Sequence, residues 1–113
     1  MARFHQLRIY HLARQVLREV VTITEENKGC GDLHSQIRRA AISVISNICE
    51  GCSAGNDVQF ARYLRIARAS CNEVQGQLDI LCDLGSIEPD HEAIDRCDHL
   101  GRSISSLIRR LSG

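Results

Sequence analysis

Four long segments with helical periodicity, separated by three short glycine-containing breaks, constrain this chain more than any other feature. The breaks fall at residues 27–31, 51–55 and 85–89. The segments between them are too long for strands and repeat apolar residues at spacings of three and four. Short connections favour antiparallel neighbours in sequence order. The sequence therefore predicts an all-α protein, an up-down antiparallel four-helix bundle in a single domain, with helices at about 4–26, 32–51, 56–84 and 89–111.

The composition agrees with a helical fold. Aromatic residues make up only 4% of the 113 residues, and tryptophan is absent. Sandwiches and barrels rely on aromatic and β-branched residues and on frequent turns. No segment approaches the roughly 18 consecutive apolar residues of a membrane-spanning helix, and residues 1–10 lack the apolar stretch of a signal peptide. We expect a cytoplasmic protein without a membrane partner.

Six cysteines raise the question of disulfides or metal. Four of them lie on apolar helix faces, where reduced cysteine behaves as a small hydrophobic residue: Cys49, Cys71, Cys82 and Cys97. The other two are Cys30 and Cys52, and only Cys49 and Cys52 form a close pair, whereas a structural zinc site needs two such pairs. We expect free, mostly buried thiols, no metal and no cofactor.

The apolar faces of the four helices differ in width. Those of the third and fourth predicted helices span about 100°, which suits one bundle core, whereas those of the first and second span about 220° and 200°. Because a single core cannot use so broad an arc, the surplus predicts self-association. The residues assigned to this interface are Ile9, Leu12, Val16, Ile23, Ile42 and Ile45. The alternative is an unusually deep core in a monomer.

Net neutrality conceals a separation of charge along the predicted bundle. One end, formed by residues 1–14, 46–69 and 100–113, holds nine arginines against two carboxylates, a net of +7. The opposite end holds five basic and twelve acidic residues, a net of −7. Arginine suits phosphate recognition. The residues predicted to contact nucleic acid are Arg3, Arg8, Arg62, Arg65, Arg68, Arg109 and Arg110.

Arg62, Arg65 and Arg68 are expected on the face of the third helix opposite its core stripe. There they are free to meet phosphate or the carboxylates of an acidic protein partner. The alternative is an ordinary solvated face. Either partner would make the chain a non-enzymatic binding protein.

A polar stripe follows the second and third predicted helices. Its members are Gln36, Arg39, Ser43, Asn47 and Glu50 on the second helix, and Ser70, Glu73 and Gln77 on the third. We expect them to form hydrogen bonds between helices or subunits, which fix register. The alternative is a groove for a ligand or a partner.

Two short patterns resemble catalytic motifs but lack the required context. Residues 51–55 read G-x-S-x-G, yet a nucleophile elbow needs a preceding strand, and a helix is predicted there. Glu88 and His91 form one Glu-x-x-His pair, whereas di-iron bundles need two such pairs and two further glutamates. The sequence therefore predicts no enzymatic activity.

Two sequence blocks in register carry a resemblance to a known family. Residues 36–43 read Q-x-x-R-A-A-x-S, and residues 47–51 read N-I-x-E-G. Together with Phe60, Tyr63 and Leu64, they resemble the proteins encoded in 23S ribosomal RNA intervening sequences, which share their fold with the accessory variability determinant of diversity-generating retroelements. The resemblance covers nearly the whole chain. Cys49 stands where the family usually has alanine, and the usual tryptophan of the first helix is missing.

The resemblance implies a ring-like homo-oligomer, with a pentamer favoured. It also implies an accessory role beside RNA or DNA, with a reverse transcriptase or a ribosomal RNA context as the setting. The retroelement relatives bind nucleic acid and a reverse transcriptase, while the intervening-sequence relatives have no settled biochemical role. The alternative function is a protein-protein interaction scaffold that docks an acidic partner.

Overall fold

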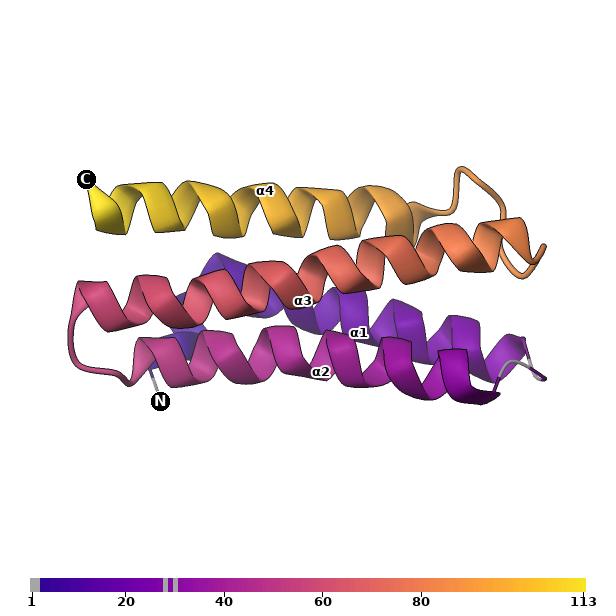
Figure 1. Ribbon diagram of the computed structural model, residues 1–113, viewed down its shortest axis with the longest axis horizontal. Helices are drawn as coiled ribbons and strands as arrows, with labels where there is room; N and C mark the ends of the chain where they lie inside the picture. Colours follow the sequence, from indigo (N-terminus) through magenta and orange to yellow (C-terminus); the bar gives the residue numbers. More distant parts are fainter. Residues whose placement is uncertain (1–2, 28, 30) are drawn as a thin grey trace.

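The computed structural model describes residues 3–27, 29 and 31–113. Its elements are a short 3-10 helix, η1 (Arg3–Gln6), and four α-helices: α1 (Arg8–Glu26), α2 (Gly31–Cys52), α3 (Asp57–Asp83) and α4 (Glu92–Ser112). All regular structure in these residues is helical, as the sequence predicts. Consecutive helices run in opposite directions, so the two termini and the α2–α3 connection share one end of the molecule (Figure 1).

All four helices contribute to one core. Val20, Ile48, Leu64 and Leu100 are fully buried, one from each helix. Helix α2 packs tightly against α3 at Gly51, where an added Cβ atom would lie 2.9 Å from Cδ1 of Phe60 and 2.9 Å from Cβ of Tyr63. Gly51 therefore lets the last turn of α2 pack directly on α3.

Local signals explain where α3 begins and ends. The side chain of Asn56 accepts a hydrogen bond of 2.9 Å from the backbone N–H of Gln59 and so caps the start of the helix. At the other end Gly85 has φ +77°, and the N–H of Ser86 bonds to the carbonyl of Leu81 at 2.9 Å. This left-handed glycine satisfies the last carbonyls of α3.

The boundaries of the other helices differ in part from the prediction. The fourth helix begins at Glu92 rather than near residue 89, because the ring nitrogen of His91 caps it by accepting from the N–H of Ala93 at 3.1 Å. Cys52, expected in a loop, lies buried in the last turn of α2. The predicted first connection includes positions 28 and 30, and both Lys28 and Cys30 lie outside the described residues.

Half of the predicted interface belongs to the bundle's own core. Ile9, Val16 and Ile23 are 5%, 2% and 2% exposed, so their assignment to an interface is wrong. Helix α1 packs against both α2 and α4, and these two contacts use much of its wide apolar arc. The remaining residues differ: Leu12 and Ile45 are half-buried, and Ile42 is 49% exposed.

Candidate nucleic-acid interface

The basic end predicted from the sequence exists as a surface, here named the arginine end. It is formed by η1, the α2–α3 connection with the first turns of α3, and the last turns of α4, which meet at one end of the bundle (Figure 1). Eight of its nine arginines are exposed: Arg3, Arg8, Arg14, Arg62, Arg65, Arg102, Arg109 and Arg110. Arg109 and Arg110 occupy the last turn of α4, where cations are favoured by the helix dipole.

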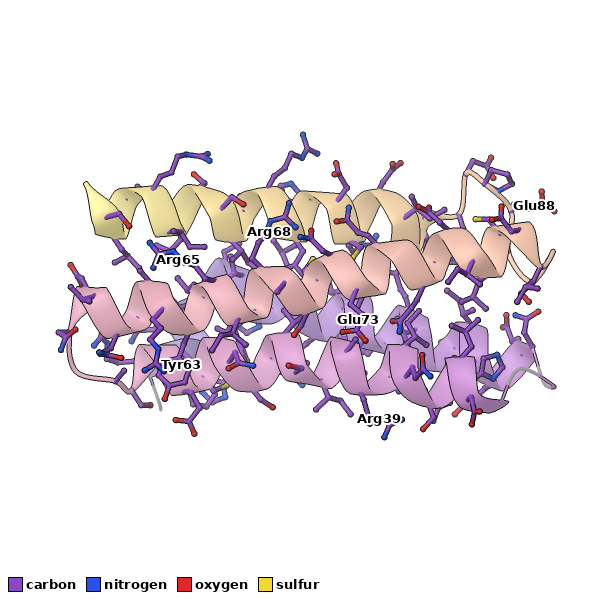
Figure 2. All side chains as sticks on the ribbon, in the orientation of Figure 1. Arg39, Tyr63, Arg65, Arg68, Glu73 and Glu88 are labelled. Atoms are coloured by element: carbon purple, nitrogen blue, oxygen red, sulfur yellow. The ribbon has the colours of Figure 1, made fainter. Side chains whose placement is uncertain are left out.

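Arg62 and Arg65 make only weak contacts with neutral partners. Nη1 of Arg62 donates to the Gln59 side-chain oxygen at 3.4 Å, and Nη2 of Arg65 donates to the Ser112 hydroxyl at 3.4 Å. In Figure 2 Arg65 lies on the side of α3 that faces α4. It lines a cavity of about 270 Å³ between the start of α3 and the end of α4, together with Asp57, Val58, Ala61, Leu111 and Ser112. Both guanidinium groups therefore keep donors available for another acceptor.

Arg68 lies elsewhere than the sequence predicts. It is half-buried on the side facing α4 (Figure 2), where its Nε donates to the Ser105 hydroxyl of α4 at 2.9 Å, and its Nη1 donates to Asn72 of its own helix. A Cβ atom on Gly101 would lie 2.5 Å from this Nη1. Six residues turn a helix by about 240° beyond one full turn, so Arg68 cannot share the outward direction of Arg62. Its assignment to a solvent-facing basic surface is wrong.

Acidic partners are scarce at the arginine end. Within the described residues the structure contains two ion pairs, Arg102 with Asp98 at 3.1 Å and Arg96 with Glu19 at 2.9 Å. Of the exposed arginines at this end only Arg102 takes part in one of these pairs, and the other seven form no ion pair within the described residues. Most of the positive charge at this end is therefore not neutralised by neighbouring carboxylates, and it produces a directed field.

The predicted polar stripe divides into separate parts. The hydroxyls of Ser43 and Ser70 lie 2.9 Å apart and join α2 to α3, and Asn47 donates to the Ser43 carbonyl at 2.9 Å. This part confirms the expected bond between helices. Glu73 only accepts, at 3.4 Å, from Gln77 of its own helix.

The other three members of the stripe are exposed: Gln36, Arg39 and Glu50. In the part of the chain that the structure describes, their side chains form no hydrogen bond to α3. Arg39 extends from α2 on the side away from α3 (Figure 2). The eight residues are therefore not one network, and only Ser43, Asn47 and Ser70 are linked across the two helices.

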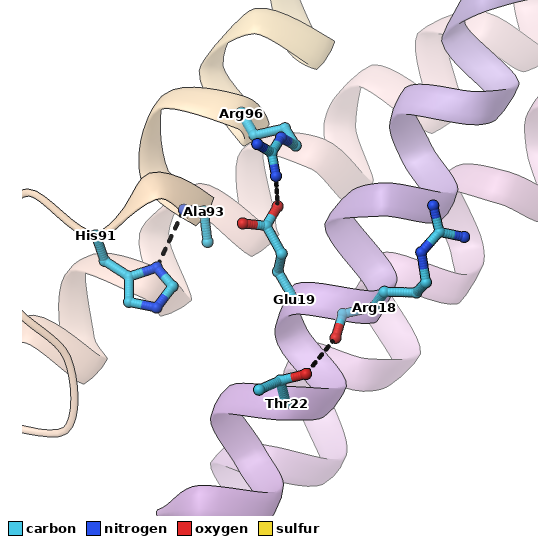
Figure 3. Close-up of polar contacts among 6 residues, drawn as sticks. All are labelled: Arg18, Glu19, Thr22, His91, Ala93 and Arg96. Atoms are coloured by element: carbon cyan, nitrogen blue, oxygen red, sulfur yellow. Dashed lines mark hydrogen bonds and ion pairs between the residues drawn. The ribbon is translucent and has the colours of Figure 1, made fainter.

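A second polar site lies between α1 and α4 and was not predicted. It is a cavity of about 340 Å³ lined by Gln15, Arg18, Glu19, Thr22, Ile23, His91, Glu92 and Arg96. Figure 3 shows the ion pair of Glu19 and Arg96 across it, with the capping ring of His91 at its edge. The position of this cavity depends on how α1 and α4 are rotated about their axes. The spacing of residues within one helix does not reveal that rotation.

Other kinds of site find no support in the described residues. No group of three or more His, Cys, Asp or Glu side chains there could hold a metal ion. None of the helices in residues 3–27 and 31–113 has the length and hydropathy needed to cross a membrane. The arginine end is accordingly the surface with the clearest chemical character.

Fold and surface together define an all-α, four-helix protein with one strongly basic end. The sequence model of one protein family, described as 23S rRNA-intervening sequence protein, matches residues 5–106. This match covers most of the chain, which therefore belongs to that family, as the resemblance predicts. No curated protein sequence matches the chain.

Proposed function

We propose that this chain is a non-enzymatic, oligomeric accessory protein of the cytoplasm that binds the phosphates of RNA or DNA through its arginine end. The observation that carries the proposal is the net charge of +7 at that end. Seven of its arginines are exposed and form no ion pair within the described residues. Guanidinium groups bind phosphate oxygens through paired hydrogen bonds, and such contacts position a protein without reading bases.

The proposal includes a ring-like homo-oligomer, with five subunits favoured. The exposed side chain of Ile42 on α2 supports it, together with the half-buried Ile45 on the same helix and the half-buried Leu17 and Val21 on α1. In an oligomer, another subunit would cover these apolar side chains. A closed ring would bring several arginine ends together and strengthen their combined field.

The test is fluorescence anisotropy with structured RNA, single-stranded RNA and duplex DNA at low and moderate salt. An Arg109→Glu, Arg110→Glu variant removes two exposed arginines of the arginine end. An Arg18→Glu, Arg39→Glu variant makes the same change of net charge on exposed arginines outside that end. We expect the first variant to lose about tenfold or more in affinity, which corresponds to about 1.4 kcal/mol, and the matched control to lose much less.

Two outcomes would contradict the proposal. Equal losses in both variants would show that overall charge, rather than the arginine end, determines binding. No binding of the wild-type protein to any of the three nucleic acids at low salt would exclude the nucleic-acid function. Binding to an acidic protein partner would then be the hypothesis to test. Oligomeric mass is measured for every variant, so that a loss of assembly is not mistaken for a loss of contact.

A further inference from the structure

Two cysteines face each other in the centre of the bundle, between α3 and α4. Cys71 and Cys97 are both 0% exposed, and their Sγ atoms lie 3.7 Å apart. The contact is reciprocal: Sγ of Cys71 lies 3.5 Å from the carbonyl oxygen of Cys97, and Sγ of Cys97 lies 3.7 Å from that of Cys71. Each side chain therefore points directly at the other helix.

The layer beside this thiol pair carries a positive charge. Arg68 precedes Cys71 by three residues and Gly101 follows Cys97 by four, so the guanidinium packed over Gly101 lies about one helical turn from the sulfurs. The hydrogen bond from Cys97 lowers the pKa of the Cys71 thiol, and the charge of Arg68 lowers it further. The hydrogen bond with Cys71, together with burial, raises the pKa of Cys97. Cys71 is thus the better nucleophile, because thiolates rather than thiols attack electrophiles.

We propose that Cys71 and Cys97 form an oxidisable dithiol that closes to a disulfide between α3 and α4, with a hydroperoxide as the oxidant. The Cys71 thiolate attacks one peroxide oxygen, an S–O bond forms, and the O–O bond breaks to release hydroxide or alkoxide. The Cys97 sulfur then displaces hydroxide from the Cys71 sulfenic acid. The S–S bond forms, the S–O bond breaks, and the two thiol protons leave in water and the reduced peroxide.

The geometry requires only a small movement. A disulfide bond measures about 2.05 Å, so the two sulfurs must approach by about 1.7 Å from their separation of 3.7 Å. About one helical turn from the pair, the half-buried side chain of Arg68 packs over Gly101. Displacement of this flexible side chain opens a path for an oxidant little larger than water, through the kind of local opening that folded proteins undergo.

The remaining described cysteines provide internal comparisons. Cys49 and Cys82 are half-buried, and Cys52 is buried in α2. No contact between two sulfur atoms occurs in the described residues apart from that of Cys71 with Cys97. If solvent exposure alone governed oxidation, Cys49 and Cys82 would react first. If the short distance between the two sulfurs governs it, Cys71 and Cys97 are cross-linked.

The test is a tryptic map of the folded wild-type protein after hydrogen peroxide and blocking of free thiols. Cleavage after Arg68, Arg96 and Arg102 places Cys71 in peptide 69–96 and Cys97 in peptide 97–102. We expect these two peptides to be linked and to separate on reduction. The Tm of the intact oxidised protein should be about 10 °C higher than that of the reduced protein, because the disulfide constrains the unfolded chain.

Two variants make the result specific. Cys82 shares peptide 69–96 with Cys71, so the link must persist in Cys82→Ser. In Cys97→Ser the link must vanish, and a sulfenic acid trapped by dimedone must appear on Cys71. The proposal is overturned if peptides 69–96 and 97–102 stay unlinked while Cys49 or Cys82 is oxidised, or if the link is lost in Cys82→Ser. The pair would then be core packing alone.

Discussion

At Gly51 the last turn of α2 comes so close to α3 that a side chain has no room. A methyl group there would meet carbon atoms of Phe60 and Tyr63 at 2.9 Å and the Phe60 carbonyl at 3.2 Å. We expect Gly51→Ala to lower the free energy of unfolding by about 1–2 kcal/mol, because overpacking outweighs the better helix propensity of alanine. Urea denaturation followed by circular dichroism measures the change.

Gly76 is the matched control for this substitution. It lies within α3, and an added Cβ there would meet nothing within 4 Å. Gly76→Ala should therefore raise the free energy of unfolding by about 0.5–1 kcal/mol. If Gly51→Ala stabilised the protein as much as Gly76→Ala does, the close approach of α2 and α3 would not exist in solution.

Single residues show where sequence reasoning succeeds and where it stops. The role of Asn56 as a helix cap could be predicted, because capping depends on residues adjacent in the chain. The sequence places Gly51 at the boundary between the second helix and the next loop, since glycine often ends a helix, whereas in the structure it lies within the last turn of α2 and allows close contact with α3. The direction of Arg68 depends on Gly101 and Ser105 of α4, and no spacing within α3 reveals those neighbours.

At the scale of one element, the cap of α3 allows a direct measurement. The side chain of Asn56 satisfies the N–H of Gln59, and Asp57 adds a favourable charge to the first turn. We expect Asn56→Ala to cost about 1 kcal/mol of unfolding free energy, whereas Asn56→Ser, which retains a capping oxygen, should be nearly neutral. Thermal and urea unfolding of both variants provide the comparison. Equal destabilisation by alanine and serine would argue that Asn56 acts through something other than its cap.

The presence of four helices could be predicted from the sequence, because each of them repeats an apolar pattern over many turns. The width of an apolar face was less informative. The broad arc of α1 predicts an interface, yet Ile9, Val16 and Ile23 are buried within the chain itself. A helix with two neighbours buries both flanks of its stripe, so an arc of about 200° does not by itself indicate a partner.

At the scale of the whole molecule, the proposed assembly depends on side chains that the bundle leaves uncovered. Ile42 on α2 is 49% exposed, and Ile80 on α3 is 45% exposed. We expect Ile42→Glu to reduce the oligomeric mass measured by light scattering after size-exclusion chromatography, because a charge placed in an apolar interface is costly. Ile80→Glu, an equivalent change on another helix, should leave the mass unchanged. If Ile42→Glu also leaves it unchanged, Ile42 is not in the interface.

Charge sorting is the whole-molecule property that sequence and fold define together. Residue counts alone give a net charge of zero, and the division into +7 and −7 appears only when the helices are laid antiparallel. The arrangement in Figure 1 brings the basic segments of η1, α3 and α4 to one end. The sequence could not reveal which of these arginines make local contacts, since that depends on side-chain packing between helices.

The salt dependence of binding tests this electrostatic reading most directly. Each phosphate that a protein neutralises contributes about −0.9 to the slope of log affinity against log salt concentration on duplex DNA. Arg109→Glu, Arg110→Glu should therefore flatten the slope by about 2 for each engaged subunit, besides weakening binding at a fixed salt concentration. Arg18→Glu, Arg39→Glu should leave the slope nearly unchanged. A weaker affinity with an unaltered slope would mean that Arg109 and Arg110 do not contact phosphate, because the loss of phosphate contacts reduces the number of released counterions.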